Sequence, residues 1–171
     1  MLIQHKLGNL NFFEIKNRQI DMLTLQWYET NKRIMHKRTI GGRELVIRFL
    51  EENPCFNQDD VLVEDDDYLV TVDILACEVI ILKPATMSQT AAICYEIGNK
   101  HLPLFLEGEE LVVPFEAPLF RLLTVAGFEP VKEKRKLLHP LKTTVAPHGS
   151  AKSASLFSRI MELTTPDSNG Y

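Results

Sequence analysis

One histidine stands at the end of a predicted helix, in the segment Ile93-Cys94-Tyr95-Glu96-Ile97-Gly98-Asn99-Lys100-His101. Gly98 can adopt a positive φ angle at little steric cost, so it predicts the end of that helix. The carboxyl end of a helix is partly negative and favours a cation beside it. Imidazole suits nickel, copper and zinc, so His101 could be a metal ligand. A lone histidine is more often structural, and both interpretations stay open at this point.

Other residues that could join a metal site are few. Cys94 and Asn99 lie in the same segment and could bind the metal ion or hold a metal ligand in place. The common alternative for Cys94 is a buried, unreactive cysteine. His139 and His148 lie at and beyond the end of the last predicted strand. The three cysteines are widely spaced and form no CxxC pair, which favours reduced thiols in a cytoplasm over a disulfide framework or a structural zinc site.

The composition excludes several classes of protein. The 171 residues carry 19 basic and 23 acidic side chains, and the net charge of −4 argues against binding to nucleic acid or an anionic membrane. No run of about 18 apolar residues is present, so we expect no transmembrane helix. The N-terminus lacks the pattern of a signal peptide, and we therefore expect a cytoplasmic protein. No acid–base pair or activated nucleophile is recognisable, so we do not expect an enzyme.

The elements that must position these side chains begin with a β-rich half, residues 1–74. Alternation over 23–27, strands at 33–39 and 45–49, and a hairpin over 61–72 predict a small β barrel or sandwich that binds a protein or peptide. A basic cluster that includes Lys32, Arg33 and Lys37 falls on one of these strands. It predicts a docking site for a partner, with a solvated strand face as the alternative.

The second half, residues 75–140, alternates strands and helices. Its order is β-α-β-β-α-β, in which Thr86 starts the first helix with Gln89 in a capping box. This order predicts a ferredoxin-like domain, and the whole chain an α+β fold. Residues 141–171 are rich in Thr, Ser, Ala, Pro and Lys and predict a mobile tail.

The segment Gly98-Asn99-Lys100-His101 resembles the Gly-Asn-Arg-His signature of UreE, the family of urease accessory nickel chaperones. The likeness extends to Trp27-Tyr28-Glu29, Asp60-Val61-Leu62 and Glu78-Val79, and covers about residues 1–148. Three departures are visible. Lys100 replaces an arginine and loses its planar fork, Asp59 replaces the turn glycine before Asp60, and the tail has no histidine-rich run.

The resemblance implies a homodimer that binds nickel where the two metal-binding domains meet. His101 would come from each subunit, and a histidine of the mobile tail, matched here by His148, would add a ligand, with His139 as the competing candidate. It also implies transfer of nickel to the urease apoenzyme together with other accessory proteins, including the GTPase UreG. Zn²⁺ or Cu²⁺ could substitute for Ni²⁺, since only the family selects the metal.

Two other classes of function stay open from the residues alone. The first is a metal-independent protein-interaction module that assists assembly of a larger complex, with the second half serving only for dimerisation. The second is an RNA-binding ferredoxin-like domain. The acidic balance and the scarcity of stacking aromatic residues on its central strands count against that reading.

Overall fold

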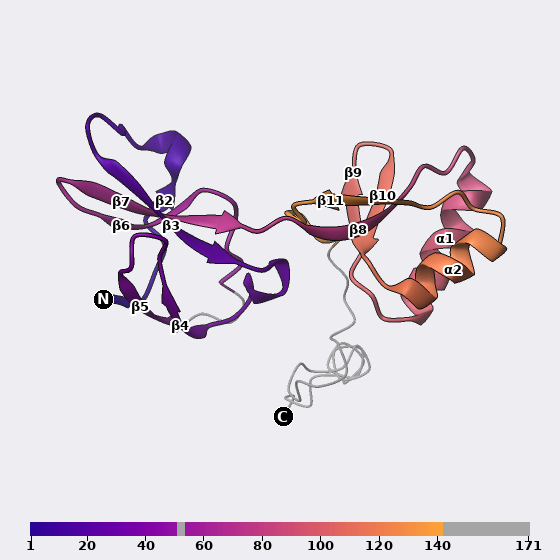
Figure 1. Ribbon diagram of the computed structural model, residues 1–171, viewed down its shortest axis with the longest axis horizontal. Coiled ribbons are helices and arrows are strands. Elements are labelled where there is room, and N and C mark those ends of the chain that lie inside the picture. The colour runs from indigo at the N-terminus through magenta and orange to yellow at the C-terminus, as the bar shows by residue number, and fades with distance from the viewer. Residues whose placement is uncertain (51–53, 142–171) are drawn as a thin grey trace, which may run out of the picture. The chain divides into compact units, whose positions relative to one another are not determined.

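A computed structural model describes residues 1–50 and 54–141 of the chain (Figure 1). The predicted tail, apart from Leu141, lies outside these described residues, and so does His148. In the described part of the chain, no helix is long and apolar enough to cross a membrane.

The first half folds into two sheets that share one hydrophobic core. One sheet has the order β1-β5-β4 and the other β2-β6-β7-β3. Their strands are β1 (Leu2–Ile3), β2 (Gly8–Asn9), β3 (Gln19–Leu25), β4 (Ile34–Arg38), β5 (Glu44–Arg48), β6 (Asp60–Glu64) and β7 (Tyr68–Ile74), with short 3-10 helices at Leu10–Phe12 and Trp27–Glu29. Buried side chains of both sheets meet in one cluster, among them Leu23, Met35, Ile47 and Val72. The predicted sandwich is therefore confirmed.

A buried carboxylate ties the turn between β4 and β5 to strand β3. Asp21 on β3 accepts hydrogen bonds from the Thr39 hydroxyl and the Gly41 N–H, both at 2.7 Å, and pairs with Arg43. The Arg43 guanidinium in turn lies 3.9 Å from the centre of the Tyr68 ring. Burial by itself would raise the pKa of Asp21, but these hydrogen bonds and the positive charge of Arg43 lower it below its ordinary value.

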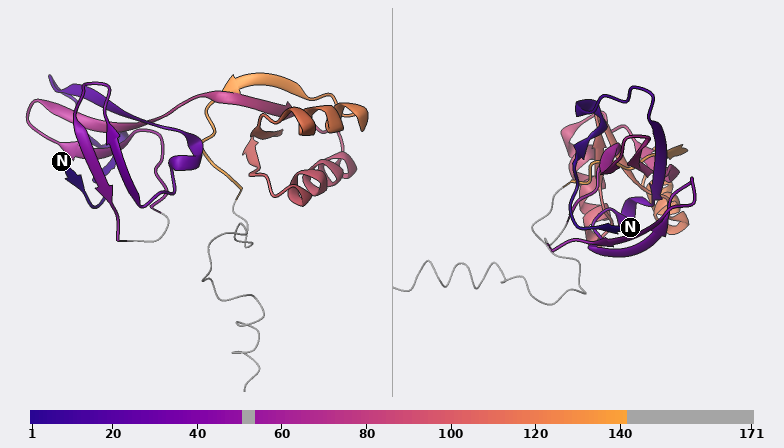
Figure 2. Two further views of the ribbon diagram at one scale, coloured as in Figure 1. Left: turned by 60° about the horizontal axis from the view of Figure 1, so that its bottom comes forward. Right: turned by 90° about the vertical axis from the view of Figure 1, so that its left-hand side faces the viewer.

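The second half has the element order that the sequence predicts. It runs β8 (Cys77–Leu82), α1 (Met87–Asn99), β9 (Phe105–Glu107), β10 (Glu110–Pro114), α2 (Ala117–Val125) and β11 (Val131–Arg135). The sheet order β11-β8-β10-β9, with every neighbouring pair antiparallel, is that of a ferredoxin-like fold. Both helices cover the same face of this sheet (Figure 2), where Ile93 and Leu119 meet Ile80 and Val113 in one core.

Candidate metal site

Helix α1 begins where the sequence predicts. Thr86 is the N-cap, and its hydroxyl oxygen accepts the N–H of Gln89 at 3.2 Å. The Gln89 Oε1 accepts a hydrogen bond from the Ala85 N–H at 2.8 Å, one residue before the Thr86 N–H that a capping box would use. Ile93 and Ile97 are the buried residues of the helix and anchor it on the sheet.

The end of α1 differs from the prediction. The helix continues through Gly98 to Asn99, and His101, with φ = 54°, is the residue in the left-handed conformation. The His101 N–H donates to Gly98 O at 3.0 Å, and the Leu102 N–H donates to Ile97 O at 3.4 Å. These two bonds form a Schellman motif, in which His101 occupies the position usually taken by glycine. The prediction that Gly98 ends the helix is therefore wrong.

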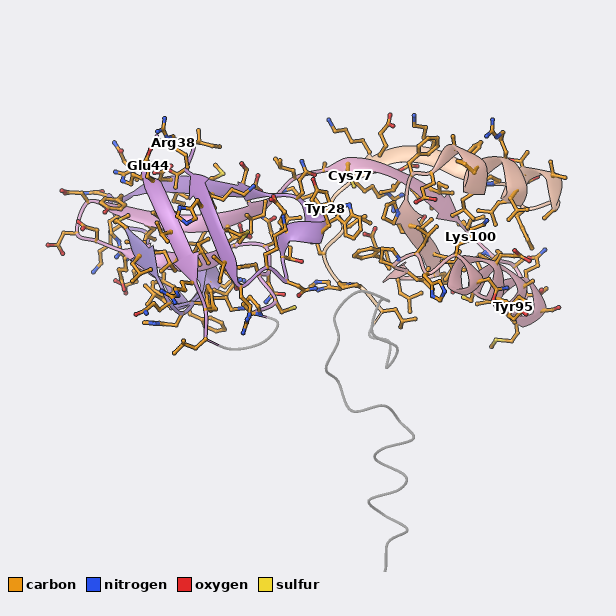
Figure 3. The ribbon with its side chains drawn as sticks, turned by 90° about the horizontal axis from the view of Figure 1, so that it is seen from below. Tyr28, Arg38, Glu44, Cys77, Tyr95 and Lys100 are labelled. Carbon is orange, nitrogen blue, oxygen red and sulfur yellow. The ribbon has the colours of Figure 1, made fainter. Side chains whose placement is uncertain are left out.

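His101 holds this conformation at an energetic disadvantage. The left-handed region costs a residue with a Cβ atom about 1–2 kcal/mol, although histidine tolerates it better than most. Leu102 packs against the core that contains Ile97, which fixes the turn and leaves His101 exposed on the surface. The turn therefore presents the imidazole group at the carboxyl end of α1, directly after Lys100, which is labelled in Figure 3. That end of the helix dipole favours a bound cation.

Of the two other predicted residues in this segment, Asn99 is exposed and Cys94 is half-buried. Cys94 packs against the core between the helices and the sheet, and burial raises the pKa of its thiol. A thiol with a raised pKa is a poorer source of the thiolate that binds metals, which favours the structural interpretation of Cys94. Within residues 1–50 and 54–141, no three His, Cys, Asp or Glu side chains form a group that could hold a metal ion.

His139 lies on the edge of the same sheet but away from His101. Pro140 forms an antiparallel bridge with Phe105, and the Leu141 N–H donates to Leu104 O at 2.7 Å. This register places His139 opposite Leu106, five residues after His101 in the chain. His139 lines a cavity of about 430 Å³ together with Leu106 and Lys136. The structure therefore holds His139 beside the edge strand β9, whereas His101 lies in the turn that ends α1.

Two members of the predicted docking cluster have a partner within the first half. Lys37 Nζ lies 2.7 Å from Glu29 Oε2, and Lys32 Nζ lies 3.4 Å from Glu29 Oε1. Burial would raise the pKa of Glu29, but the bonds from Lys37 and Gln26 and the two positive charges lower it. Arg33 is exposed. Sequence reasoning missed the role of Glu29, which lies eight residues before Lys37, and the docking role of the cluster stays a prediction.

Comparisons with known proteins agree with one another. The family model described as UreE urease accessory protein, N-terminal domain, matches residues 3–75, which end where β7 passes into β8. The chain is 40% identical over 163 residues to urease accessory protein UreE of Flavobacterium johnsoniae, which covers 95% of this chain and 99% of that relative. It is 41% identical over 149 residues to UreE of Haemophilus influenzae strain PittGG, with coverage of 85% and 80%. UreE of Acetivibrio thermocellus is 34% identical over 155 residues, with coverage of 91% and 99%.

Proposed function

Because this chain belongs to the UreE family of urease accessory proteins, we propose that it is a nickel chaperone for urease maturation. In this proposal it binds Ni²⁺ where two subunits meet and delivers it for assembly of the urease active site, and Zn²⁺ or Cu²⁺ could occupy the same ligands. It is an accessory protein and not urease itself, acts in the cytoplasm and catalyses no reaction of its own. Its partners are the urease apoenzyme and other accessory proteins, including the UreG GTPase.

The left-handed conformation of His101 is the observation that carries this proposal. Glycine would be more stable at this position, so a histidine held there in a strained conformation supports a role for its side chain. The imidazole lies on the surface at a helix end that favours a cation, and the described residues around it provide no complete set of ligands. An ion bound there needs further ligands, which a second subunit and the tail would provide.

The exposed face of α1 supports a dimer in this half of the chain. Met87 is 83% exposed and Tyr95 69%, and Ala91 and Gly98 are exposed between them. At 100° per residue these four positions fall within about 80° of the helix surface, and they lead towards His101. A Cβ atom built on Gly98 would meet nothing within 4 Å, so the face has room for close approach of a second chain. A two-fold axis along this face would bring the two copies of His101 together.

The first prediction tests this site on the native, untagged protein. Light scattering is expected to give the mass of a dimer, and titration calorimetry one tightly bound Ni²⁺ per dimer. His101→Ala should remove that binding, while His36→Ala, which removes an exposed histidine of the first half, should leave it unchanged. A dimer that retains no nickel would instead favour the metal-independent interaction module, and unchanged binding in His101→Ala would exclude the proposed site.

The pairing of residues 140 and 141 supports His148 as the additional ligand. Pro140 opposite Phe105 and Leu141 opposite Leu104 run antiparallel to the segment that leads back to His101. His148 lies seven positions after Leu141, and a segment of that length can span about 25 Å when extended. This length is enough for His148 to reach a site at His101, three residues before Leu104.

The second prediction separates the two candidate histidines of the C-terminal part. We expect His148→Ala to lower the affinity for Ni²⁺ about tenfold without abolishing binding, because His101 still captures the ion. Metal-dependent protection of the tail against protease should disappear in the same variant. His139→Ala should match the parent in both measurements, because the bridge from Pro140 to Phe105 holds His139 at the sheet edge, where it lines a cavity with Leu106 and Lys136. If the two variants behave alike, the tail does not supply the ligand.

A further inference from the structure

Strand β4 is an edge strand whose outer side has unpaired backbone groups. The Phe49 N–H donates to Arg33 O and the Thr39 N–H to Arg43 O, both at 2.9 Å, so the odd-numbered residues of β4 bond to β5. The N–H and C=O groups of Ile34, His36 and Arg38 therefore point away from β5. In the described part of the chain no other strand pairs with β4 on that side.

The open edge has a defined length. At its C-terminal end the Ile40 N–H donates to Met22 O of β3 at 2.9 Å, which closes the gap between the two sheets there. The strand itself spans Ile34–Arg38, so about five residues of an added strand could pair with it. Ile34 is 61% exposed, and the outward side chains of β4 and β5 form one face, the outer β4–β5 face: Ile34, His36, Arg38, Glu44, Val46 and Arg48.

The segment that forms this edge is rich in basic residues. Residues 32–48 contain six Lys or Arg and one Glu, although the whole chain has a net charge of −4. Four of the six basic residues form ion pairs. Glu29 pairs with Lys32 and Lys37, and Asp21 pairs with Arg43. Glu44 pairs with Arg38 at the end of the β4–β5 hairpin, and both residues are labelled in Figure 3. Arg33 and Arg48 are exposed and have no carboxylate partner among residues 1–50 and 54–141. Their guanidinium groups are the ones that a bound acidic chain would contact in the following proposal.

We propose that the outer edge of β4 binds an extended acidic segment of a partner protein, which pairs with Ile34–Arg38 as an additional strand. Backbone hydrogen bonds would supply the affinity, and alternate side chains of the segment would contact Ile34 or the arginines on the outer β4–β5 face. Positive charge on an edge strand opposes pairing with a second copy of itself, so an acidic partner fits better than self-association. The role of that partner in urease maturation rests on the proposed function. The binding edge itself lies on β4 and uses no residue of the proposed nickel site.

The test uses the full-length protein and a synthetic probe. A fluorescein-labelled octapeptide of alternating Glu and Val is titrated with the protein, and fluorescence anisotropy measures binding. We expect saturable binding that weakens as salt rises. A Lys–Val octapeptide should bind at least tenfold more weakly, and so should a Glu–Val peptide whose alternate amide nitrogens are methylated and cannot pair. Equal binding of either control peptide would overturn the proposal.

Matched variants then locate the site. His36→Pro removes an N–H that points to the open edge without breaking the β4–β5 ladder, and should weaken peptide binding at least tenfold. His36→Ala keeps that N–H and should bind within about threefold of the parent. Arg48→Glu should also weaken binding at least tenfold, whereas Lys134→Glu, on β11 of the second half, should not. Parent-like binding by both His36→Pro and Arg48→Glu would exclude this edge. Nickel stoichiometry should stay unchanged in all four variants, so failure here is distinguishable from failure of the nickel site.

Discussion

Replacing His101 with glycine is expected to abolish tight nickel binding and to raise the free energy of unfolding by about 1 kcal/mol. Nickel affinity falls while stability rises, because the backbone conformation of this residue is strained and its side chain is the proposed metal ligand. The left-handed conformation at φ = 54° disfavours a residue with a Cβ atom, and glycine relieves that strain. The same substitution removes the imidazole that we propose as the metal ligand.

Two further variants separate these contributions. His101→Ala should lose nickel binding without the gain in stability, because alanine keeps the strained Cβ atom. His101→Asn should stay close to the parent in stability, since asparagine tolerates the left-handed region. Thermal unfolding of the metal-free protein and nickel calorimetry measure the two properties. A glycine variant less stable than the parent would show that side-chain contacts of His101 outweigh the backbone strain.

Replacing Gly41 with alanine is expected to destabilise the first half by about 2–4 kcal/mol. A Cβ atom at this position would lie 2.8 Å from Asp21 Oδ2 and 2.9 Å from Oδ1, closer than nonbonded atoms approach. The carboxylate has no free direction in which to retreat, because Thr39, Arg43 and the Gly41 N–H itself hold it. Relief of the clash would require breaking bonds to a buried charge.

Gly98→Ala is the matched control for this substitution. Gly98 lies inside α1 with nothing within 4 Å of a built Cβ atom, so alanine there should stabilise the helix by about 0.5–1 kcal/mol. Urea unfolding, monitored for both variants and the parent, gives the comparison. If Gly41→Ala unfolds at the same urea concentration as the parent, the Asp21 network is more adaptable than its hydrogen bonds indicate.

Most of the fold could be predicted because its signals are local. Alternation of apolar residues over 23–27 located the end of β3, and the order of strands and helices in the second half is sufficient to identify the ferredoxin-like topology. Strand β9 starts only at Phe105, because Pro103 has no N–H to give to a ladder and Leu102 belongs to the helix end.

The geometry of the candidate site depends on packing that the local sequence does not display. Glycine propensity favours Gly98 as the helix end, but packing of Leu102 against the core goes with a helix that continues to Asn99 and sets His101 in the left-handed turn. The ion pair of Lys37 with Glu29 likewise depends on the burial of Glu29, which follows from the packing of the folded chain and not from the local sequence. His148 lies outside the described residues, so its ligand role stays a prediction.

The uneven distribution of charge has a kinetic consequence. Residues 32–48 hold six of the 19 Lys and Arg residues and one of the 23 acidic residues, so the remainder of the chain has 13 basic and 22 acidic side chains. An acidic partner is attracted to one short segment and repelled by most of the remaining surface, which orients the encounter before contact. Salt would slow this capture steeply while changing the lifetime of the bound complex less, because backbone pairing is not screened in the same way. The speed with which a partner is found and the time for which it is held would thus be determined by different groups of atoms.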